Sequence, residues 1–137
     1  MIETWIVELC AKHARNLLGF TAKNRYTYPG QYNEAAWVVL GMGDDGHTAS
    51  LFPNSPNLDD GLAASSPHRC LPMLAPSVPH QRLSMTRTLL TSAGFIALAV
   101  QGPNKLATLR AALAGNDLTE MPIRAFLHDP LDIYWCP

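Results

Sequence analysis

The feature that most constrains the fold is a short apolar segment that runs directly into a glycine-rich polar loop. Residues 36–40 end in Trp-Val-Val-Leu, a β-branched and aromatic run that predicts a buried strand. The loop that follows, residues 41–53, reads GMGDDGHTASLFP. Open α/β sheets bind ligands at the carboxyl ends of their strands, so this loop is the first candidate for a site. Glycine-rich loops also serve only to turn a corner, and a loop histidine is often structural, so that alternative stays open.

The rest of the chain predicts one domain of alternating strands and helices. In the first half we expect a helix over residues 1–18, a polar, turn-rich segment over 19–35 and an edge strand at 69–73. A half-buried strand over 81–87, a short helix over 88–94 and a buried strand over 95–100 follow. The chain then continues with a loop over 101–105, a helix that starts near Pro103 and runs to 114, and a strand over 131–135. This order is typical of an α/β layer with a mostly parallel sheet.

Composition narrows the function classes. The net charge is −1 and no basic run is present, which argues against nucleic acid as a partner. No apolar run is long enough to cross a membrane and no signal peptide is evident, so we expect a cytoplasmic protein. Three separated cysteines predict reduced thiols. His47, His68 and His80 raise the question of a metal, but their spacing is not that of metal ligands, and we expect neither metal nor cofactor.

Three motifs, taken in order, resemble those of the 6-phosphogluconolactonase family. The loop at 41–53 is similar to the family signature LGMGxDGHTASLFP. Residues 79–86, Pro-His-Gln-Arg-Leu-Ser-Met-Thr, resemble its P-x-x-R-[IL]-[ST]-[LM]-T segment, and residues 102–105 its G-x-x-K turn. The segment from 122 to 135 is similar to the terminus of some bacterial members. The resemblance covers residues 36–137 and leaves residues 1–35 unmatched.

The resemblance implies a Rossmann-like, mostly parallel sheet of the glucosamine-6-phosphate isomerase/6-phosphogluconolactonase type. Family members are longer, and their N-terminal half has no counterpart in this sequence. We therefore expect a single, incomplete domain over residues 1–137. A parallel sheet that lacks its first strands has an exposed edge. A homodimer, pairing with a separate N-terminal segment, and an inactive chain all remain open.

The implied reaction is the hydrolysis of 6-phospho-D-glucono-1,5-lactone to 6-phosphogluconate, in the oxidative pentose phosphate pathway and without a metal. In this interpretation the imidazole of His47 activates water and Asp45 orients the ring. The backbone N–H groups of residues 43–46, with Gly43, Asp44 and Gly46 as substrate-binding residues, would stabilise the developing negative charge. The family positions of Arg82 and Lys105 imply that these two cations hold the phosphate. Without the resemblance, Arg82 would be interpreted as an exposed charge on a strand, and Lys105 as a solvated residue at the start of a helix.

Two other classes of function are weighed against the lactonase. The chain could be a non-catalytic phosphosugar-binding remnant, or a subunit that needs a separate N-terminal piece. It could also be an aldose–ketose isomerase or a deaminase on the same fold. Glucosamine-6-phosphate deaminases share the Gly-Asp-Gly-His core but continue with an FNEP-like segment. No acid occurs between Ser50 and Asn54, which disfavours that reading.

Overall fold

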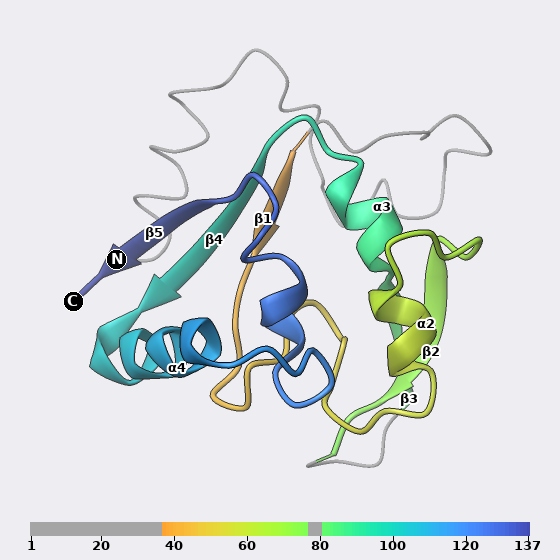
Figure 1. The fold of residues 1–137 in the computed structure, drawn as a ribbon, viewed down its shortest axis with the longest axis horizontal. Helices are drawn as coiled ribbons and strands as arrows, with labels where there is room; N and C mark the ends of the chain where they lie inside the picture. Colours follow the sequence, from red (N-terminus) through yellow and green to blue (C-terminus); the bar gives the residue numbers. More distant parts are fainter. Residues whose placement is uncertain (1–36, 77–80) are drawn as a thin grey trace.

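The computed structural model describes residues 37–76 and 81–137. The helix predicted over residues 1–18, the polar segment over 19–35 and the imidazole of His80 lie outside these residues. Within them the chain forms two groups of elements. Figure 1 shows three parallel strands on one side of the molecule, and a two-stranded ladder with two short helices on the other.

The parallel sheet has the order β1-β4-β5 and confirms the predicted α/β architecture. Its strands are β1 (Val38–Leu40), β4 (Ile96–Gln101) and β5 (Asp132–Cys136). β4 lies in the centre, and four of its six side chains are buried. An uninterrupted apolar run is what a strand between two neighbours and beneath a helix requires, so this prediction is confirmed.

One helix packs against this sheet, and one short 3₁₀ segment contacts that helix. The helix α4 (Gly102–Ala114) contacts β4, β5 and the segment η2 (Pro122–Ala125). Leu109 and Ala112 are the buried side chains of α4, and Phe126, just after η2, is fully buried. The predicted helix up to residue 114 is confirmed. The predicted loop before it is wrong, because β4 passes directly into α4 at Gly102, whose φ of +84° makes the sharp turn.

The second group contains α2 (Leu58–Leu62), β2 (Cys70–Leu74), β3 (Gln81–Met85) and α3 (Arg87–Thr91). β2 and β3 pair antiparallel, and α2 contacts both α3 and β2. Buried side chains from both groups form one continuous hydrophobic core, in which Leu51 of the glycine-rich loop is fully buried. The loop is therefore anchored between the two groups of elements.

The half-buried strand predicted over residues 81–87 forms over Gln81–Met85, and its one buried side chain is polar. The apolar residues Leu83 and Met85 are 72% and 38% exposed, whereas Ser84 is 2% exposed. The Ser84 hydroxyl accepts a hydrogen bond from the Ser50 N–H at 3.2 Å and donates one to the Met85 carbonyl. A buried hydroxyl with both partners in place is tolerated, so here hydrogen bonding and not hydrophobicity decides which face of the strand turns inward.

The short helix α3 begins one residue earlier than predicted and ends three residues before Gly94. Thr86 caps its first turn, because its hydroxyl accepts from the Leu89 N–H. The Thr86 hydroxyl also donates to the His68 carbonyl at 2.8 Å and so ties α3 to the segment before β2.

Candidate active site

The glycine-rich loop leaves the carboxyl end of β1 and is held by a set of internal hydrogen bonds. The Gly43 N–H donates to the His47 carbonyl at 2.9 Å, and the Gly46 N–H donates to the Gly43 carbonyl at 3.1 Å. The buried Thr48 hydroxyl donates back to the Gly41 carbonyl at 2.8 Å. From outside the loop, the Ile123 N–H of η2 donates to the Gly46 carbonyl at 2.9 Å. The loop thus has one defined shape, fixed by its own backbone and by η2.

Within this loop the imidazole of His47 and the carboxylate of Asp45 form a close pair. His47 Nδ1 lies 2.5 Å from Asp45 Oδ1, and the His47 backbone N–H donates to the same oxygen at 3.1 Å. Partial burial raises the pKa of Asp45, but the hydrogen bonds and the charge interaction with His47 outweigh it and hold that pKa below its ordinary value. The carboxylate therefore accepts a hydrogen bond from Nδ1–H, and in the neutral ring Nε2 is left with a free lone pair.

Gly43 makes room for this pair. A methyl group added at Gly43 would lie 2.1 Å from His47 Nδ1 and 2.6 Å from Asp45 Oδ1, far inside contact distance. The ring of Phe52 contacts the imidazole from another side, with centroids 4.6 Å apart and an interplanar angle of 45°. The His47 side chain is 31% exposed, so solvent reaches the ring.

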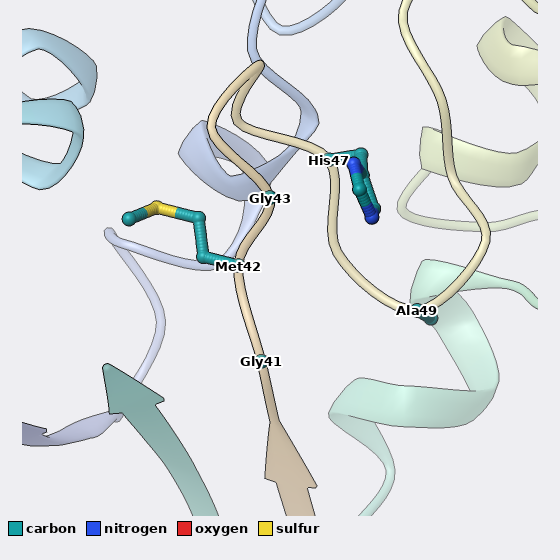
Figure 2. Close-up of a pocket in the computed structure, with 5 residues that line it drawn as sticks. All are labelled: Gly41, Met42, Gly43, His47 and Ala49. Carbon is teal, nitrogen blue, oxygen red and sulfur yellow. The ribbon is translucent and has the colours of Figure 1, made fainter. Parts of the chain in front are cut away.

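A shallow pocket of about 290 Å³ opens beside the imidazole. Its lining comes from the start of the loop: Gly41, Met42, Gly43, His47 and Ala49. In Figure 2 the Met42 side chain points to the opposite side of the loop from the imidazole, in keeping with its burial in the core. The space next to the ring is therefore bordered largely by backbone, which a small polar substrate can approach closely.

The second loop carboxylate, Asp44, is paired with Lys105. Lys105 Nζ lies 2.6 Å from Asp44 Oδ1, and the two side chains are 28% and 80% exposed. Lys105 lies near the start of α4, at the carboxyl end of β4, and Asp44 lies in the loop at the carboxyl end of β1. Because β1 and β4 are parallel neighbours, both ends lie at the same edge of the sheet, which is why two residues so far apart in sequence can meet.

Arg82 lies away from this group, on β3. It is exposed, and within residues 37–76 and 81–137 no hydrogen bond or ion pair joins it to the loop. It shares a face of β3 with Ser84, whose hydroxyl bonds to the Ser50 N–H of the loop, and two residues of strand span about 7 Å. The structure therefore brings together His47, Asp45, Asp44 and Lys105, and places Arg82 on a neighbouring element.

The oxyanion role predicted for the N–H groups of residues 43–46 needs correction at Gly43 and Gly46, and stays a prediction for Asp44 and Asp45. The N–H groups of Gly43 and Gly46 both donate to carbonyls inside the loop. They shape the loop and are not available to a substrate oxygen in this conformation. An N–H already bound to a carbonyl cannot also stabilise a developing charge without breaking that bond.

Sequence reasoning gave no role to Arg124, which secures η2. Arg124 is buried, with 5% of the residue exposed. Its guanidinium donates to the carbonyls of Ala112 at 3.1 Å and Asp117 at 2.8 Å. It also pairs with Glu120 at 2.5 Å. A methyl group at Gly115 would lie 2.2 Å from the guanidinium, so glycine at the end of α4 leaves the space for it. A glycine after a helix followed by an arginine is too common a pattern to reveal this contact.

Over residues 37–76 and 81–137, no group of three or more histidine, cysteine, aspartate or glutamate side chains is arranged to hold a metal ion. Among the helices in the same part of the chain, none has the length and apolar character needed to cross a membrane.

Comparison with known proteins identifies relatives. A family model described as glucosamine-6-phosphate isomerases/6-phosphogluconolactonase matches residues 6–135. The 6-phosphogluconolactonase of Pseudomonas putida is 85% identical over 100 residues, which are 73% of this chain and 41% of that protein. The 6-phosphogluconolactonase of Pseudomonas aeruginosa is 62% identical over 100 residues, 73% of this chain and 42% of that protein.

The fold is also similar to that of a solved relative. The crystal structure of a 6-phosphogluconolactonase from Shewanella baltica OS155 matches with a TM-score of 0.68 and 32% identity, over 94% of this chain and 50% of that one. The chain spans less than half the length of the two Pseudomonas relatives that it matches.

Proposed function

Because the chain belongs to the glucosamine-6-phosphate isomerase/6-phosphogluconolactonase family, we propose that it is the water-activating part of a 6-phosphogluconolactonase. The proposed reaction is hydrolysis of 6-phospho-D-glucono-1,5-lactone to 6-phosphogluconate. The observation that carries this proposal is the His47–Asp45 pair, which leaves one ring nitrogen as a base beside a pocket. We also propose that the protein acts in the cytoplasm, the compartment expected from the sequence.

In the proposed mechanism His47 Nε2 takes a proton from water as the water oxygen attacks the lactone carbonyl. The carbon–oxygen bond of the ring then breaks, and the imidazolium returns the proton to the leaving ring oxygen. Asp45 fixes the ring orientation and stabilises its charged form. A positioned base of this kind contributes about 10²–10⁴-fold to the rate. The step uses protein groups and water, and no metal.

The remaining site residues bind the substrate in this proposal. Lys105 and Arg82 hold the phosphate, Lys105 as a point charge and Arg82 through its fork of donors. Gly43 and Gly46 border the substrate and shape the loop, and Asp44 lies beside the phosphate through its contact with Lys105. The absence of an acid between Ser50 and Asn54 disfavours a deaminase, so we expect no turnover of glucosamine 6-phosphate.

The proposal is tested with freshly prepared 6-phosphogluconolactone and the chain alone. We expect turnover above the spontaneous rate, lost in His47→Ala. His68→Ala is the matched control, since His68 is an exposed imidazole that lies 3.6 Å from Asp60. Equal activity of His47→Ala and the wild-type chain would remove His47 from the mechanism.

A second function is favoured by the partial length of the chain. Val39, Leu74 and Leu83 are 42%, 42% and 72% exposed, as expected where further protein would cover them. We propose as the alternative a phosphosugar-binding part that needs a separate N-terminal segment, or a homodimer, for activity. Calorimetry with 6-phosphogluconate would then show binding without turnover. Adding the N-terminal part of the Pseudomonas putida relative should restore turnover, whereas a homodimer would appear in sedimentation.

A further inference from the structure

We propose that Asp44 is a built-in counter-ion for Lys105 that the phosphate of the substrate displaces, so that Asp44 sets how tightly phosphate binds. The inference rests on the proposed function, because it takes Lys105 as a phosphate ligand. The two adjacent carboxylates of the loop then have different roles. Asp45 bonds to the imidazole of His47, and Asp44 pairs with the ammonium of Lys105.

The position of the pair near the start of α4 favours an anion beside Lys105. Lys105 lies near the N-terminal end of α4, where the helix dipole already favours negative charge and disfavours a cation. The ammonium adds a full positive charge there, and the Asp44 carboxylate lies against it at 2.6 Å. The structure thus shows a carboxylate in the place where a phosphate oxygen would be stabilised for the same electrostatic reasons.

The exposed fractions of the two side chains indicate that replacing the Asp44 carboxylate by a phosphate at Lys105 costs little free energy. Asp44 is 80% exposed, so water solvates its carboxylate fully once it leaves Lys105. Lys105 is 28% exposed, so most of its side chain is covered by protein. Exposed ion pairs contribute little to stability. A phosphate monoester carries about −1.5 to −2 charges near neutral pH and is therefore a stronger partner for an ammonium than a carboxylate is.

Release of Asp44 requires only a side-chain rotation. The backbone on both sides is fixed, since the Gly43 N–H and the Gly46 N–H donate within the loop and η2 holds the Gly46 carbonyl. The neighbouring Asp45 stays bonded to His47. Phosphate entry can therefore break the Asp44–Lys105 contact and leave the water-activating pair in place.

The test is a double-mutant cycle read by calorimetry with inorganic phosphate and with 6-phosphogluconate, using Asp44→Asn, Lys105→Gln and the combined variant of the full chain. Asp44→Asn should bind both ligands about two- to fivefold more tightly than the wild-type chain, the range expected for one exposed ion pair. In the Lys105→Gln background the same change should give no gain, because the cation that Asp44 occupies is gone. Asp59→Asn is the matched control, because it alters the net charge equally at an exposed residue of α2.

Each outcome decides between this inference and the proposed function. Unchanged or weaker binding by Asp44→Asn overturns the inference, and so does a gain that persists without Lys105 or appears equally in Asp59→Asn. Turnover of the lactone combined with any of these results leaves the proposed function standing. Tighter phosphate binding by Asp44→Asn in a chain without turnover supports the counter-ion and rejects the lactonase. Neither phosphate binding nor turnover by any variant rejects both.

Discussion

Replacing Gly43 with alanine should separate the imidazole of His47 from the carboxylate of Asp45 while leaving the fold intact. The added methyl carbon would lie 2.1 Å from His47 Nδ1 and 2.2 Å from His47 Cε1. Non-bonded atoms of this kind pack at about 3.5–4.0 Å, so the imidazole must move by roughly 1.5 Å or more. The ring is partly exposed and swings outward more easily than the hydrogen-bonded backbone shifts.

The size of the effect follows from this displacement. A misplacement of about 1 Å in a catalytic group is enough to cost about 10²-fold in rate, and the whole base contributes about 10²–10⁴-fold. We therefore expect kcat to fall by about two orders of magnitude in Gly43→Ala. Stability should change little, because Gly43 does not have a positive φ and the lost ion pair is partly exposed, where such pairs are worth about 0–1 kcal/mol.

Two measurements check the prediction, and Gly41→Ala is the matched control. A methyl group at Gly41 meets no atom within 4 Å, so that variant keeps the imidazole in place and should lose far less activity. The first measurement is lactone turnover, and the second is the ¹⁵N spectrum of the His47 ring, which reports the hydrogen bond from Nδ1 to Asp45 and needs no turnover. Wild-type kcat together with a wild-type His47 spectrum in Gly43→Ala would refute the reasoning.

The remaining predictions concern Asp45 and Arg124. Because the folded-state pKa of Asp45 is lowered, its pairing stabilises the protein above the unfolded pKa of about 4 and is lost as pH falls through the folded pKa. Urea unfolding between pH 6 and pH 2 should therefore show a steeper acid loss for the wild-type chain than for Asp45→Asn; equal slopes would contradict this. Arg124→Ala should lower the free energy of unfolding by about 2–4 kcal/mol, because it removes a buried side chain together with its hydrogen bonds to the carbonyls of Ala112 and Asp117. The exposed Arg110→Ala is its control, and equal denaturation midpoints for the two variants would contradict the role given to Arg124.

Sequence patterns predicted the parts of the fold that depend on hydrophobic burial along one element. The run over residues 95–100 is apolar because β4 lies between β1 and β5 and most of its side chains are buried. The apolar pattern predicts this burial directly. The strand predicted over 81–87 forms over 81–85, and the sequence did not reveal which face turns inward, since alternation gives the period of a strand and cannot weigh a hydroxyl with two partners against an exposed Leu83. Which face of β3 points outward depends on how β3 pairs with β2, and the sequence of β3 alone does not give that pairing.

The candidate site divides in the same manner between local and distant contacts. The Asp45–His47 pair joins residues two apart, so the short motif itself places them together. The Asp44–Lys105 contact joins two parallel strands through their carboxyl ends, and nothing in the spacing of residues 44 and 105 indicates it. The support that Arg124 gives to η2, and η2 to Gly46, is likewise a product of tertiary packing.

The His47–Asp45 pair, proposed to activate water, is built entirely from residues that this chain contains. Asp45, His47 and the space at Gly43 come from one loop, which is supported from outside by η2 at Gly46 and by β3 at Ser50. The phosphate-binding cations proposed here lie on two other elements, α4 and β3, and Arg82 on β3 has no bond to the loop within the described part of the chain. A segment supplied by a longer relative would therefore act on how the substrate is held, through KM and the placement of Arg82. The geometry of the His47–Asp45 pair, and with it the ¹⁵N signature of the ring, should be the same with or without that segment.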